Sequence, residues 1–310
     1  MTNENESQHE QIIILGSGPA GLSAALYAAR AERNPLVLTG TDLGGQASLT
    51  NMIENYPGFP DGVGGVELAT LMQKQAENFG ARIEMDTVTS VNLSKRPYEI
   101  KTYSKTYLAE SLIIATGASP VHLNVPGEQE FTGQGVSYCA TCDGWFFRDR
   151  KVVVVGGGDS ALEEALFLTR FASEIVIIHR RDEFRAGALL QSRAESNKKI
   201  RMILNTVVNE IEGGNGVKKV SLTNVKTGEI SELETDGVFI FIGHNPNTEL
   251  FQGQLAMDAR GYLQVDSHLA TSVTGVFAAG EVADPTFRQV VTSAGMGAAA
   301  AMQADKFLSR

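Results

Sequence analysis

The chain has 310 residues, with 26 lysines and arginines against 36 aspartates and glutamates, a formal net charge of −10. An acidic surface repels phosphate backbones and anionic lipids, which disfavours nucleic-acid and membrane binding. Hydrophobic residues make up 43% of the chain and charged residues 20%, a composition typical of globular proteins rather than disordered ones. At about 150 residues per domain, the length predicts about two domains.

The sequence offers neither a membrane span nor a secretory signal. No apolar run approaches the ~20 residues that a membrane span requires. Residues 1–10 are polar and acidic, without the basic start and apolar stretch of a signal peptide. We therefore expect a cytoplasmic protein. The chain has only two cysteines, Cys139 and Cys142, which excludes a disulfide scaffold and suggests redox chemistry or half of a metal site.

The first part of the chain alternates apolar runs with helical segments. Residues 11–15 predict a strand, residues 22–30 a helix of small residues, and residues 36–39 a second strand. Residues 87–106 alternate apolar and polar residues and predict an antiparallel hairpin, and residues 111–116 predict another strand. Continuous β-branched runs are typical of strands buried on both faces of a parallel sheet, so we expect an α/β fold.

The same pattern returns about 140 residues later, so two similar units are expected. Its segments, in order, are a strand at 151–155, a helix ending near 171, a strand at 175–178, antiparallel hairpins over 207–233, strands at 237–242 and 275–279, and a closing helix at 292–308. Proline follows a strand near Ser119-Pro120 and at His244-Asn245-Pro246, which places the expected boundaries there.

The first strand breaks into Gly16-Ser17-Gly18-Pro19-Ala20-Gly21, which matches the dinucleotide-binding fingerprint in its required setting between strand and helix. Its glycines allow a tight turn, close approach of the backbone to a pyrophosphate, and close packing of helix on sheet. After the second strand come Thr39-Gly40-Thr41-Asp42 and Gly44-Gly45-Gln46, with no arginine nearby. This disfavours NADP and leaves FAD or NAD. A purely structural tight turn is the alternative.

The second unit carries Gly156-Gly157-Gly158-Asp159-Ser160-Ala161, the variant of the fingerprint that ends in alanine. A site for NAD expects an acidic residue after the second strand, but this chain has His179-Arg180-Arg181 and then Arg185. Guanidinium groups bind a 2′-phosphate, so the second site is predicted to take NADP. The alternative is a solvated basic patch.

Cys139-Ala140-Thr141-Cys142 has the spacing of a disulfide that is readily reduced. A zinc site would need two further ligands, and none of the five histidines has metal-ligand spacing, so no metal is expected. An inert structural pair is a further alternative. Asp143 could protonate a leaving thiolate if burial raises its pKa, or it could cap a helix that begins there. Two dinucleotide sites and a dithiol suggest a hydride donor, a flavin and a disulfide in series.

These motifs together resemble the bacterial-type, low-molecular-weight thioredoxin reductase family over essentially the full chain. The matching segments, in order, are Gly16-Ser17-Gly18-Pro19-Ala20-Gly21, Gly44-Gly45-Gln46, Glu54-Asn55-Tyr56-Pro57-Gly58, Ala115-Thr116-Gly117, Cys139-Ala140-Thr141-Cys142-Asp143-Gly144, Gly157-Gly158-Asp159-Ser160-Ala161, His179-Arg180-Arg181 and Gly280-Glu281-Val282.

The resemblance implies two Rossmann-like dinucleotide-binding domains. A discontinuous FAD-binding domain would span residues 1–118 and 246–310, and an inserted NADP-binding domain, residues 119–245, would carry the two cysteines. It also implies a homodimer that holds FAD noncovalently and uses NADPH to reduce oxidised thioredoxin. Because one inserted domain carries both the dithiol and the nicotinamide site, each of which must reach one flavin, a domain rotation between half-reactions is expected.

The resemblance also assigns residues. Cys142 would face the flavin, Cys139 would attack the disulfide of the partner protein, and Asp143 would act as acid and base. The FAD contacts would be Gly16, Gly18, Pro19, Ala20, Gly21, residues 39–46 with Thr39, Gly40, Gly44, Gly45 and Gln46, then Asn55, Ala115, Thr116, Gly117, Gly280, Glu281, Arg288, Gln289 and Val290. The NADP contacts would be Gly156, Gly158, Asp159, Ser160, Ala161, His179, Arg180, Arg181 and Arg185.

Three residues depart from the family pattern. Glu281 replaces the usual Asp near the ribityl chain of the flavin, Phe287 replaces a common Tyr, and Trp145 replaces the usual Phe after the redox motif. None of them removes a catalytic group.

Three other functions fit part of the sequence. A flavoprotein dithiol oxidase would not need Arg180, Arg181 and Arg185, and a ferredoxin or flavodoxin reductase that uses NADP would not need the cysteines. A non-catalytic module that senses NADP would contain no flavin. The combination of both dinucleotide turns with the dithiol favours the disulfide reductase.

Overall fold

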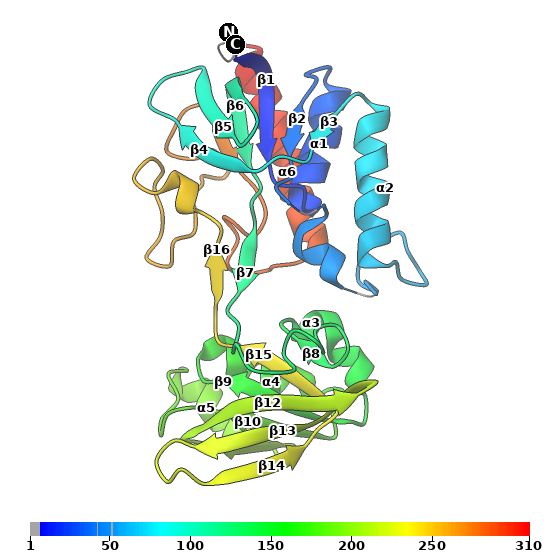
Figure 1. Cartoon of the computed structure of the whole chain (residues 1–310), viewed down its shortest axis with the longest axis vertical. Helices are drawn as coiled ribbons and strands as arrows, with labels where there is room; N and C mark the ends of the chain where they lie inside the picture. Colours follow the sequence, from blue (N-terminus) through cyan, green and yellow to red (C-terminus); the bar gives the residue numbers. More distant parts are fainter. Residues whose placement is uncertain (1–6, 42, 51) are drawn as a thin grey trace. The chain divides into compact units, whose positions relative to one another are not determined.

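The computed structural model describes residues 7–41, 43–50 and 52–310. It divides into two compact units, Met1–Ser119 with Asn245–Arg310 (unit 1) and Pro120–His244 (unit 2). Two short strands carry the chain across the boundaries, β7 (Ala118–Pro120) and β16 (His244–Pro246), and they pair with each other in a two-stranded sheet (Figure 1).

The sheet of unit 1 has a parallel core. Its order begins β3 (Arg82–Glu84), β2 (Leu36–Leu38), β1 (Gln8–Leu15) and β6 (Thr106–Ile114), and neighbouring strands in this part are parallel. Beyond β6 the sheet divides, because the first half of β6 pairs antiparallel with β5 (Tyr98–Thr102) and the second half pairs parallel with β17 (Val276–Ala278). β4 (Val88–Asn92) extends the antiparallel branch, which confirms the predicted hairpin.

Alternation along β1 gives unit 1 two apolar layers. Ile12 and Ile14 pack with small residues of α1 (Pro19–Arg30) and α6 (Val290–Leu308), including Ala24 and Ala304. Ile13 and Leu15 belong to a second cluster on the opposite face, with residues of β2, β5 and β6. The small-residue helices therefore approach the sheet closely. Two further helical elements are α2 (Gly65–Asn78), which lies beside α1, and η1 (Gly45–Leu49), a short 3-10 turn (Figure 1).

Unit 2 is a second parallel sheet. Its order is β11 (Ile200–Ile203), β10 (Glu174–Ile178), β9 (Lys151–Gly156), β15 (Gly237–Phe241) and β8 (Val136–Ser137), with every neighbouring pair parallel. One face packs against α4 (Asp159–Leu168) and α5 (Ala188–Glu195). The other is covered by an antiparallel sheet of β12 (Thr206–Gly214), β13 (Gly216–Asn224) and β14 (Ile230–Glu234) (Figure 1).

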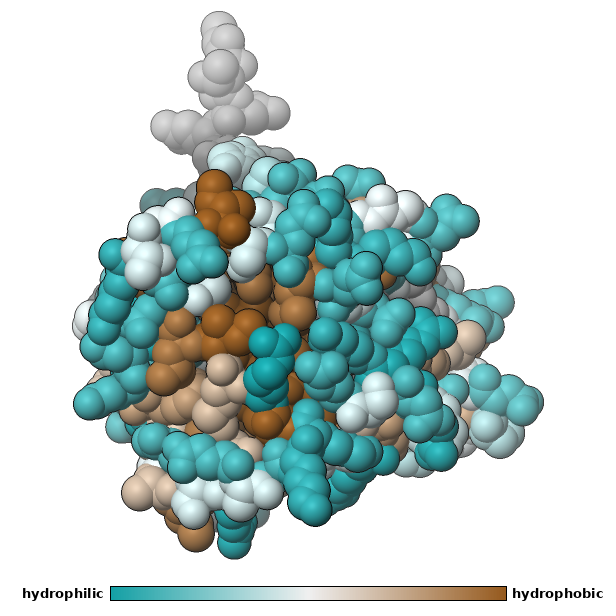
Figure 2. Space-filling view, turned by 90° about the horizontal axis from the view of Figure 1, so that it is seen from below, coloured by the Kyte–Doolittle hydropathy of each residue, from teal (hydrophilic) through white to brown (hydrophobic). Residues whose placement is uncertain are grey.

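The structure confirms the predicted α/β class with two dinucleotide-binding units. Short elements such as β3, β8 and β11, whose two to four residues give little pattern, are absent from the sequence-based prediction. The longer helices α2 and α5 are absent from it as well. The remaining short elements are α3 (Ala140–Asp143), η2 (Gly144–Phe147) and η3 (Glu249–Phe251). Among the described residues, no helix combines the length and apolar character needed to cross a bilayer. Figure 2 shows a face covered largely by hydrophilic residues, with hydrophobic ones gathered in one part.

Candidate active site

The first glycine turn links β1 to α1. Gly16 has a φ of +103°, and its N–H donates to the carbonyl of Leu38 at 2.9 Å. A β-carbon on Gly21 would lie 1.9 Å from the carbonyl oxygen of Gly16, so any side chain there would push the helix off the turn. Gly18 is the N-cap of α1, and the nearest atom to a β-carbon built on it is the Gly44 oxygen at 4.0 Å. The turn therefore has no room for a side chain at Gly16 and Gly21 but has free space at Gly18, where a pyrophosphate has to approach the backbone.

Several candidate FAD residues meet around this turn. The N–H of Gly44 donates to Ser17 at 3.1 Å, and a β-carbon on Gly45 would lie 3.2 Å from the Cα of Gly18. This places Gly44 and Gly45 against the turn, and Gln46 follows them in η1. Asp42, within the predicted run 39–46, lies outside the described residues. Thr39 and Gly40 follow β2, and their N–H groups donate to the backbone carbonyls of Glu84 and Asp86, respectively.

The carboxyl ends of the parallel strands also gather here. Ala115 follows β6 and donates to the Leu15 carbonyl at 2.8 Å, and Ala279 follows β17 and donates to the Ile114 carbonyl at 2.9 Å. Thr116 and Gly117 continue from Ala115, as Gly280 does from Ala279. Ligands of open α/β sheets bind at this carboxyl edge.

The segment after β17 contains Gln289, which contacts another of the predicted FAD residues, Asn55. Asn55 donates through its side-chain amide to Oε1 of Gln289 at 3.2 Å, and Val290 packs on a small apolar cluster that contains Ile53. Arg288 has a φ of +50° and follows a turn whose backbone N–H groups bond to the Asp284 carboxylate.

Two departures from the family pattern lie in this segment of unit 1. Burial raises the pKa of Glu281 above its usual value, and the positive charge of Arg288 opposes that shift. Phe287 is 67% exposed.

The second glycine turn links β9 to α4 in unit 2. Gly158 is the N-cap of α4, and no atom of the described residues lies within 4 Å of a β-carbon built on it. At Gly156, which has a φ of +154°, a β-carbon would lie 2.4 Å from the Phe241 oxygen. Asp159, Ser160 and Ala161 begin α4, and Asp159 accepts the Gly187 N–H at 2.7 Å. This turn has the same closed flanks and open centre as the first.

His179 and the three arginines follow β10 and take different positions. The His179 ring is buried, stacks on Phe184 at 5.2 Å between centroids, and bonds through Nε2 to the Glu183 carbonyl at 3.0 Å. Burial lowers its pKa, and the nearby positive charges of Arg181, Arg185 and Arg180 lower it further. The three arginines are exposed, and the Arg185 N–H donates to the Gly157 carbonyl at 2.7 Å, which holds this segment beside the glycine turn.

The two cysteines form a disulfide, with 5.3 Å between their Cα atoms. Cys139 is the N-cap of α3, and its sulfur accepts the Cys142 N–H at 3.2 Å. Asp143 is the last residue of α3 and is partly buried. Burial raises the pKa of its carboxyl, and a hydrogen bond from Ser137 Oγ at 2.6 Å opposes the shift. A carboxyl that keeps its proton more readily than usual lies beside the disulfide.

Asp143 does occupy the N-cap position of a short helical element, η2, but its side chain makes no capping bond. The N-cap of α3 is Cys139. Trp145 follows in η2 and is 52% exposed, with the Arg148 guanidinium 4.2 Å above its ring and Phe171 against its edge.

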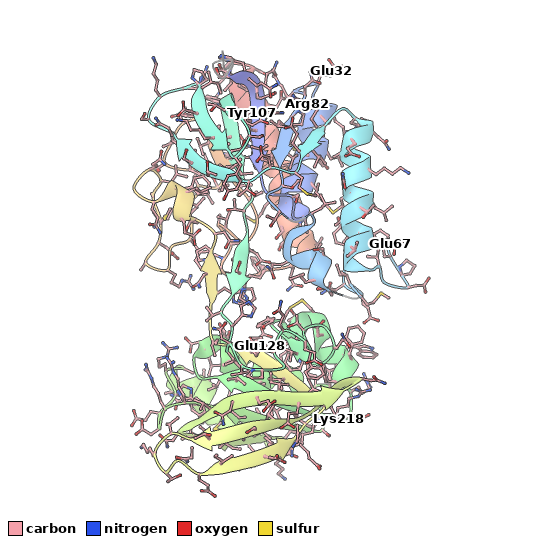
Figure 3. All side chains as sticks on the ribbon, viewed as in Figure 1. Glu32, Glu67, Arg82, Tyr107, Glu128 and Lys218 are labelled. Carbon is pink, nitrogen blue, oxygen red and sulfur yellow. A yellow bond between two sulfur atoms is a disulfide. The ribbon has the colours of Figure 1, made fainter. Side chains whose placement is uncertain are left out.

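Sequence reasoning missed three residues that organise these segments. Asn247 donates to the Thr116 carbonyl at 2.8 Å, and its own carbonyl accepts the Thr116 hydroxyl at 2.7 Å. The buried carboxylate of Glu128, labelled in Figure 3, accepts the hydroxyl of Tyr138 at 2.8 Å and two backbone N–H groups. Ser137 holds Asp143. The only available signal was their position beside a motif or a boundary.

Comparison with known proteins places the chain in a family. The profile described as "Pyridine nucleotide-disulphide oxidoreductase" matches residues 10–297. The thioredoxin reductase of Rickettsia conorii is 52% identical over 305 residues, 97% of this chain and 98% of that protein. A solved thioredoxin reductase from Streptococcus pyogenes is 42% identical, with a TM-score of 0.94 over 98% of this chain and 99% of that one. The Lactococcus lactis thioredoxin reductase in its "FR conformation" is also 42% identical, with a TM-score of 0.66 over 97% and 99%.

The chain belongs to the thioredoxin reductases of the pyridine nucleotide-disulphide oxidoreductase family. It is therefore an oxidoreductase that acts on a sulfur group. Cys139 and Cys142 fit the redox-active disulfide, since they are the only cysteines and are bonded to each other. The family implies a flavin and a pyridine nucleotide as cofactors.

Proposed function

We propose that this protein uses NADPH and bound FAD to reduce oxidised thioredoxin. The observation that carries the proposal is the Cys139–Cys142 disulfide followed by the partly buried carboxyl of Asp143, in the unit that also contains the second glycine turn and its arginines. A zinc site or an inert pair would not need the raised pKa of this carboxyl.

Unit 1 is proposed to bind FAD. The open space at Gly18 and the start of α1 suit the pyrophosphate, because the positive end of the helix dipole and the backbone N–H groups face it. The other residues proposed to hold the flavin nucleotide are Thr39, Gly40, Gly44, Gly45, Gln46, Asn55, Ala115, Thr116, Gly117, Gly280, Glu281, Arg288, Gln289 and Val290.

Unit 2 is proposed to bind NADPH. The open space at Gly158 suits its pyrophosphate, and the exposed guanidinium groups of Arg180, Arg181 and Arg185 suit the 2′-phosphate. Asp159, Ser160 and Ala161 would line the start of α4. The buried ring of His179 suits a supporting role beneath the turn better than direct contact with phosphate.

When bound, the two cofactors supply a hydride and pass its electron pair to the disulfide. The reduced Cys139 then attacks one sulfur of the thioredoxin disulfide as a thiolate, breaking that S–S bond and forming a mixed disulfide. The departing thioredoxin thiolate takes a proton from Asp143. Cys142 then gives its proton to Asp143 and attacks the Cys139 sulfur as a thiolate. This releases the thioredoxin sulfur that was bonded to Cys139, as a thiolate that solvent can protonate, and restores the Cys139–Cys142 disulfide.

We further propose that the two units change orientation between half-reactions. The proposed NADPH site and the dithiol both belong to unit 2, whereas the proposed FAD site belongs to unit 1, so both must reach one flavin. β7 and β16 are the two connections about which the units would rotate. The different TM-scores of the two solved relatives, at equal identity, are expected if their units are oriented differently.

A homodimer, which the resemblance implies, and the cytoplasmic location expected from the sequence complete the proposal. The test is NADPH oxidation by purified, yellow protein with and without oxidised thioredoxin, repeated for Cys142→Ser. Thioredoxin-dependent turnover that disappears in the variant is expected. Oxygen consumption with small dithiols and no use of NADPH would support the dithiol oxidase instead, and a colourless protein that does not consume NADPH would overturn both. Light scattering measures the oligomeric state.

A further inference from the structure

Ser137 connects the two sides of the redox-active segment. It is a buried residue at the end of β8, two positions before Cys139. Its hydroxyl oxygen lies 2.6 Å from Oδ2 of Asp143, 3.1 Å from the backbone nitrogen of Cys139 and 3.2 Å from the backbone oxygen of Cys139. One hydroxyl therefore contacts both the carboxyl after the disulfide and the backbone of its first cysteine.

The three contacts suit both protonation states of Asp143. A serine hydroxyl has one hydrogen to donate and two lone pairs that accept. When Asp143 is ionised, Ser137 donates to Oδ2 and accepts the Cys139 N–H. When Asp143 is protonated, its O–H can donate to Ser137, which still accepts the Cys139 N–H and turns its own hydrogen to the Cys139 carbonyl. A distance of 2.6 Å is typical of a hydroxyl bonded to a carboxylate.

We propose that Ser137 is a positioning residue that holds the Asp143 carboxyl and the Cys139 backbone in one hydrogen-bonded unit while the proton moves between Asp143 and the leaving thiolate. The proposal rests on the proposed function. In the step concerned, the Cys139 thiolate forms a bond to one thioredoxin sulfur, the thioredoxin S–S bond breaks, and the second thioredoxin sulfur leaves with the electron pair and takes the Asp143 proton. The Ser137 hydroxyl reorients and is unchanged.

Charged residues on neighbouring elements do not take over this role. α4 and η2 are in contact with α3. α4 carries Asp159, Glu163 and Glu164, and Arg148 follows η2. None of these charges contributes to the shift of the Asp143 pKa, which has burial as its first cause and the Ser137 bond as its second. Removing the hydroxyl should therefore raise the pKa of Asp143 further and leave the carboxyl free to rotate.

The experiment measures thioredoxin-dependent turnover against pH for the intact protein, Ser137→Ala, Asp143→Asn and the double variant. We expect Ser137→Ala to lower kcat/KM for thioredoxin by about tenfold, a part of what a general acid supplies. Its loss of activity at high pH should begin at a higher pH than in the intact protein. In the Asp143→Asn background the serine change should have no further effect, because the two residues act as one unit.

Two variants control for structural damage. Ser111→Ala removes a buried hydroxyl of the same kind, which donates to the Gly275 carbonyl at 2.8 Å in unit 1, and should leave the pH profile unchanged. Ser137→Thr keeps the hydroxyl and should restore the profile. If Ser137→Ala does not fold, Ser137→Thr is compared with Ser137→Val, which has the same shape without a hydroxyl.

Two results would overturn the proposal even if the intact protein reduces thioredoxin. One is the same pH profile for Ser137→Ala and the intact protein. The other is a loss of kcat/KM in the double variant equal to the product of the losses in the two single variants. Absence of thioredoxin reduction in the intact protein would instead overturn the proposed function, and this inference with it.

Discussion

The imidazole of His179 lies directly against Gly157: a β-carbon built on the glycine would be 2.2 Å from Nδ1. The ring cannot easily withdraw, because it stacks on Phe184 and bonds to the Glu183 carbonyl. The second glycine turn therefore packs against a buried side chain from the segment that follows β10.

We predict opposite kinds of damage from alanine at two adjacent glycines. Gly157→Ala must displace the His179 ring and should lower the stability of unit 2 by about 1–3 kcal/mol, the usual cost of overpacking. Gly158→Ala meets no described protein atom within 4 Å, so the protein should fold normally but bind NADPH more weakly, because the methyl group occupies the space proposed for phosphate. Chemical unfolding and NADPH titration of both variants separate the two effects. Similar stability of the two variants would contradict this account.

His179 should make stability depend on pH. Burial lowers its pKa in the folded protein, the bond to the Glu183 carbonyl opposes this shift and the arginine charges add to it, so the unfolded chain binds its proton more readily. The contribution of the neutral ring is complete above the unfolded pKa of about 6.5. It decreases as the pH falls from there toward the folded pKa. The free energy of unfolding, measured between pH 7.5 and pH 5, should fall less steeply in His179→Gln than in the intact protein.

Loss of the Tyr138 hydroxyl should destabilise unit 2. This hydroxyl donates to the buried Glu128 carboxylate at 2.8 Å, and the same carboxylate accepts the N–H groups of Leu123 and Asn124. Tyr138→Phe should cost about 1–3 kcal/mol, because one bond to a charged group is lost. Glu128→Ala should cost more, since two backbone donors lose their partner and the Tyr138 hydroxyl keeps only its contact with His122 Nδ1 at 2.9 Å. Tyr103→Phe, at a side chain that is 82% exposed, is the matched control, and urea unfolding is the measurement.

The three arginines after β10 should determine the preference of the enzyme for NADPH over NADH. Arg180→Gln, Arg181→Gln and Arg185→Gln should each raise KM for NADPH by about tenfold or more, because each removes a charge-assisted bond to the 2′-phosphate. KM for NADH should change little. Arg201→Gln removes an exposed arginine that is paired with Glu174, and it should leave both constants unchanged. An equal rise for both nucleotides would show that these arginines do not bind the 2′-phosphate.

Two glycines of α6 should respond to alanine in opposite directions. A β-carbon on Gly297 would lie 1.9 Å from the Ala20 carbonyl oxygen, so Gly297→Ala must separate α6 from α1 and should weaken both stability and flavin retention. No described atom lies within 4 Å of a β-carbon on Gly295, which is exposed. Gly295→Ala should therefore stabilise the protein by up to about 1 kcal/mol, as expected for alanine over glycine in a helix. Thermal unfolding and the ratio of flavin to protein after dialysis give both results.

Motifs made of contiguous residues can be recognised from the sequence alone. Gly16 to Gly21, Gly156 to Ala161 and the cysteine pair each lie within six residues, so strand, turn and helix follow from local pattern and backbone geometry. The hairpin that became β4 and β5 was readable for the same reason, since alternation with a period of two needs only neighbouring residues. The specific contacts that the predicted site residues make with cofactors stay predictions.

Contacts made across long stretches of chain could not be read in this way. Asn247 forms a hydrogen bond with Thr116 across 131 residues of chain, and no sequence pattern near either residue predicts this contact. Even the shorter link between Glu128 and Tyr138, ten residues apart, depends on a loop that returns to β8. The burial that raises the pKa of Asp143 could not be predicted from its neighbours in sequence, because desolvation depends on every element packed around a carboxyl.

The sequence by itself determined the α/β class, the two glycine turns, the arginines after β10 and the pairing of the only two cysteines, because spacing along a strand, a turn or one helical turn is enough to specify them. Tertiary structure alone decided that Ser137 bonds to Asp143 and that His179 supports Gly157 instead of facing solvent. These outcomes depend on which side chains exclude water from one another, and that is settled only when distant segments pack together.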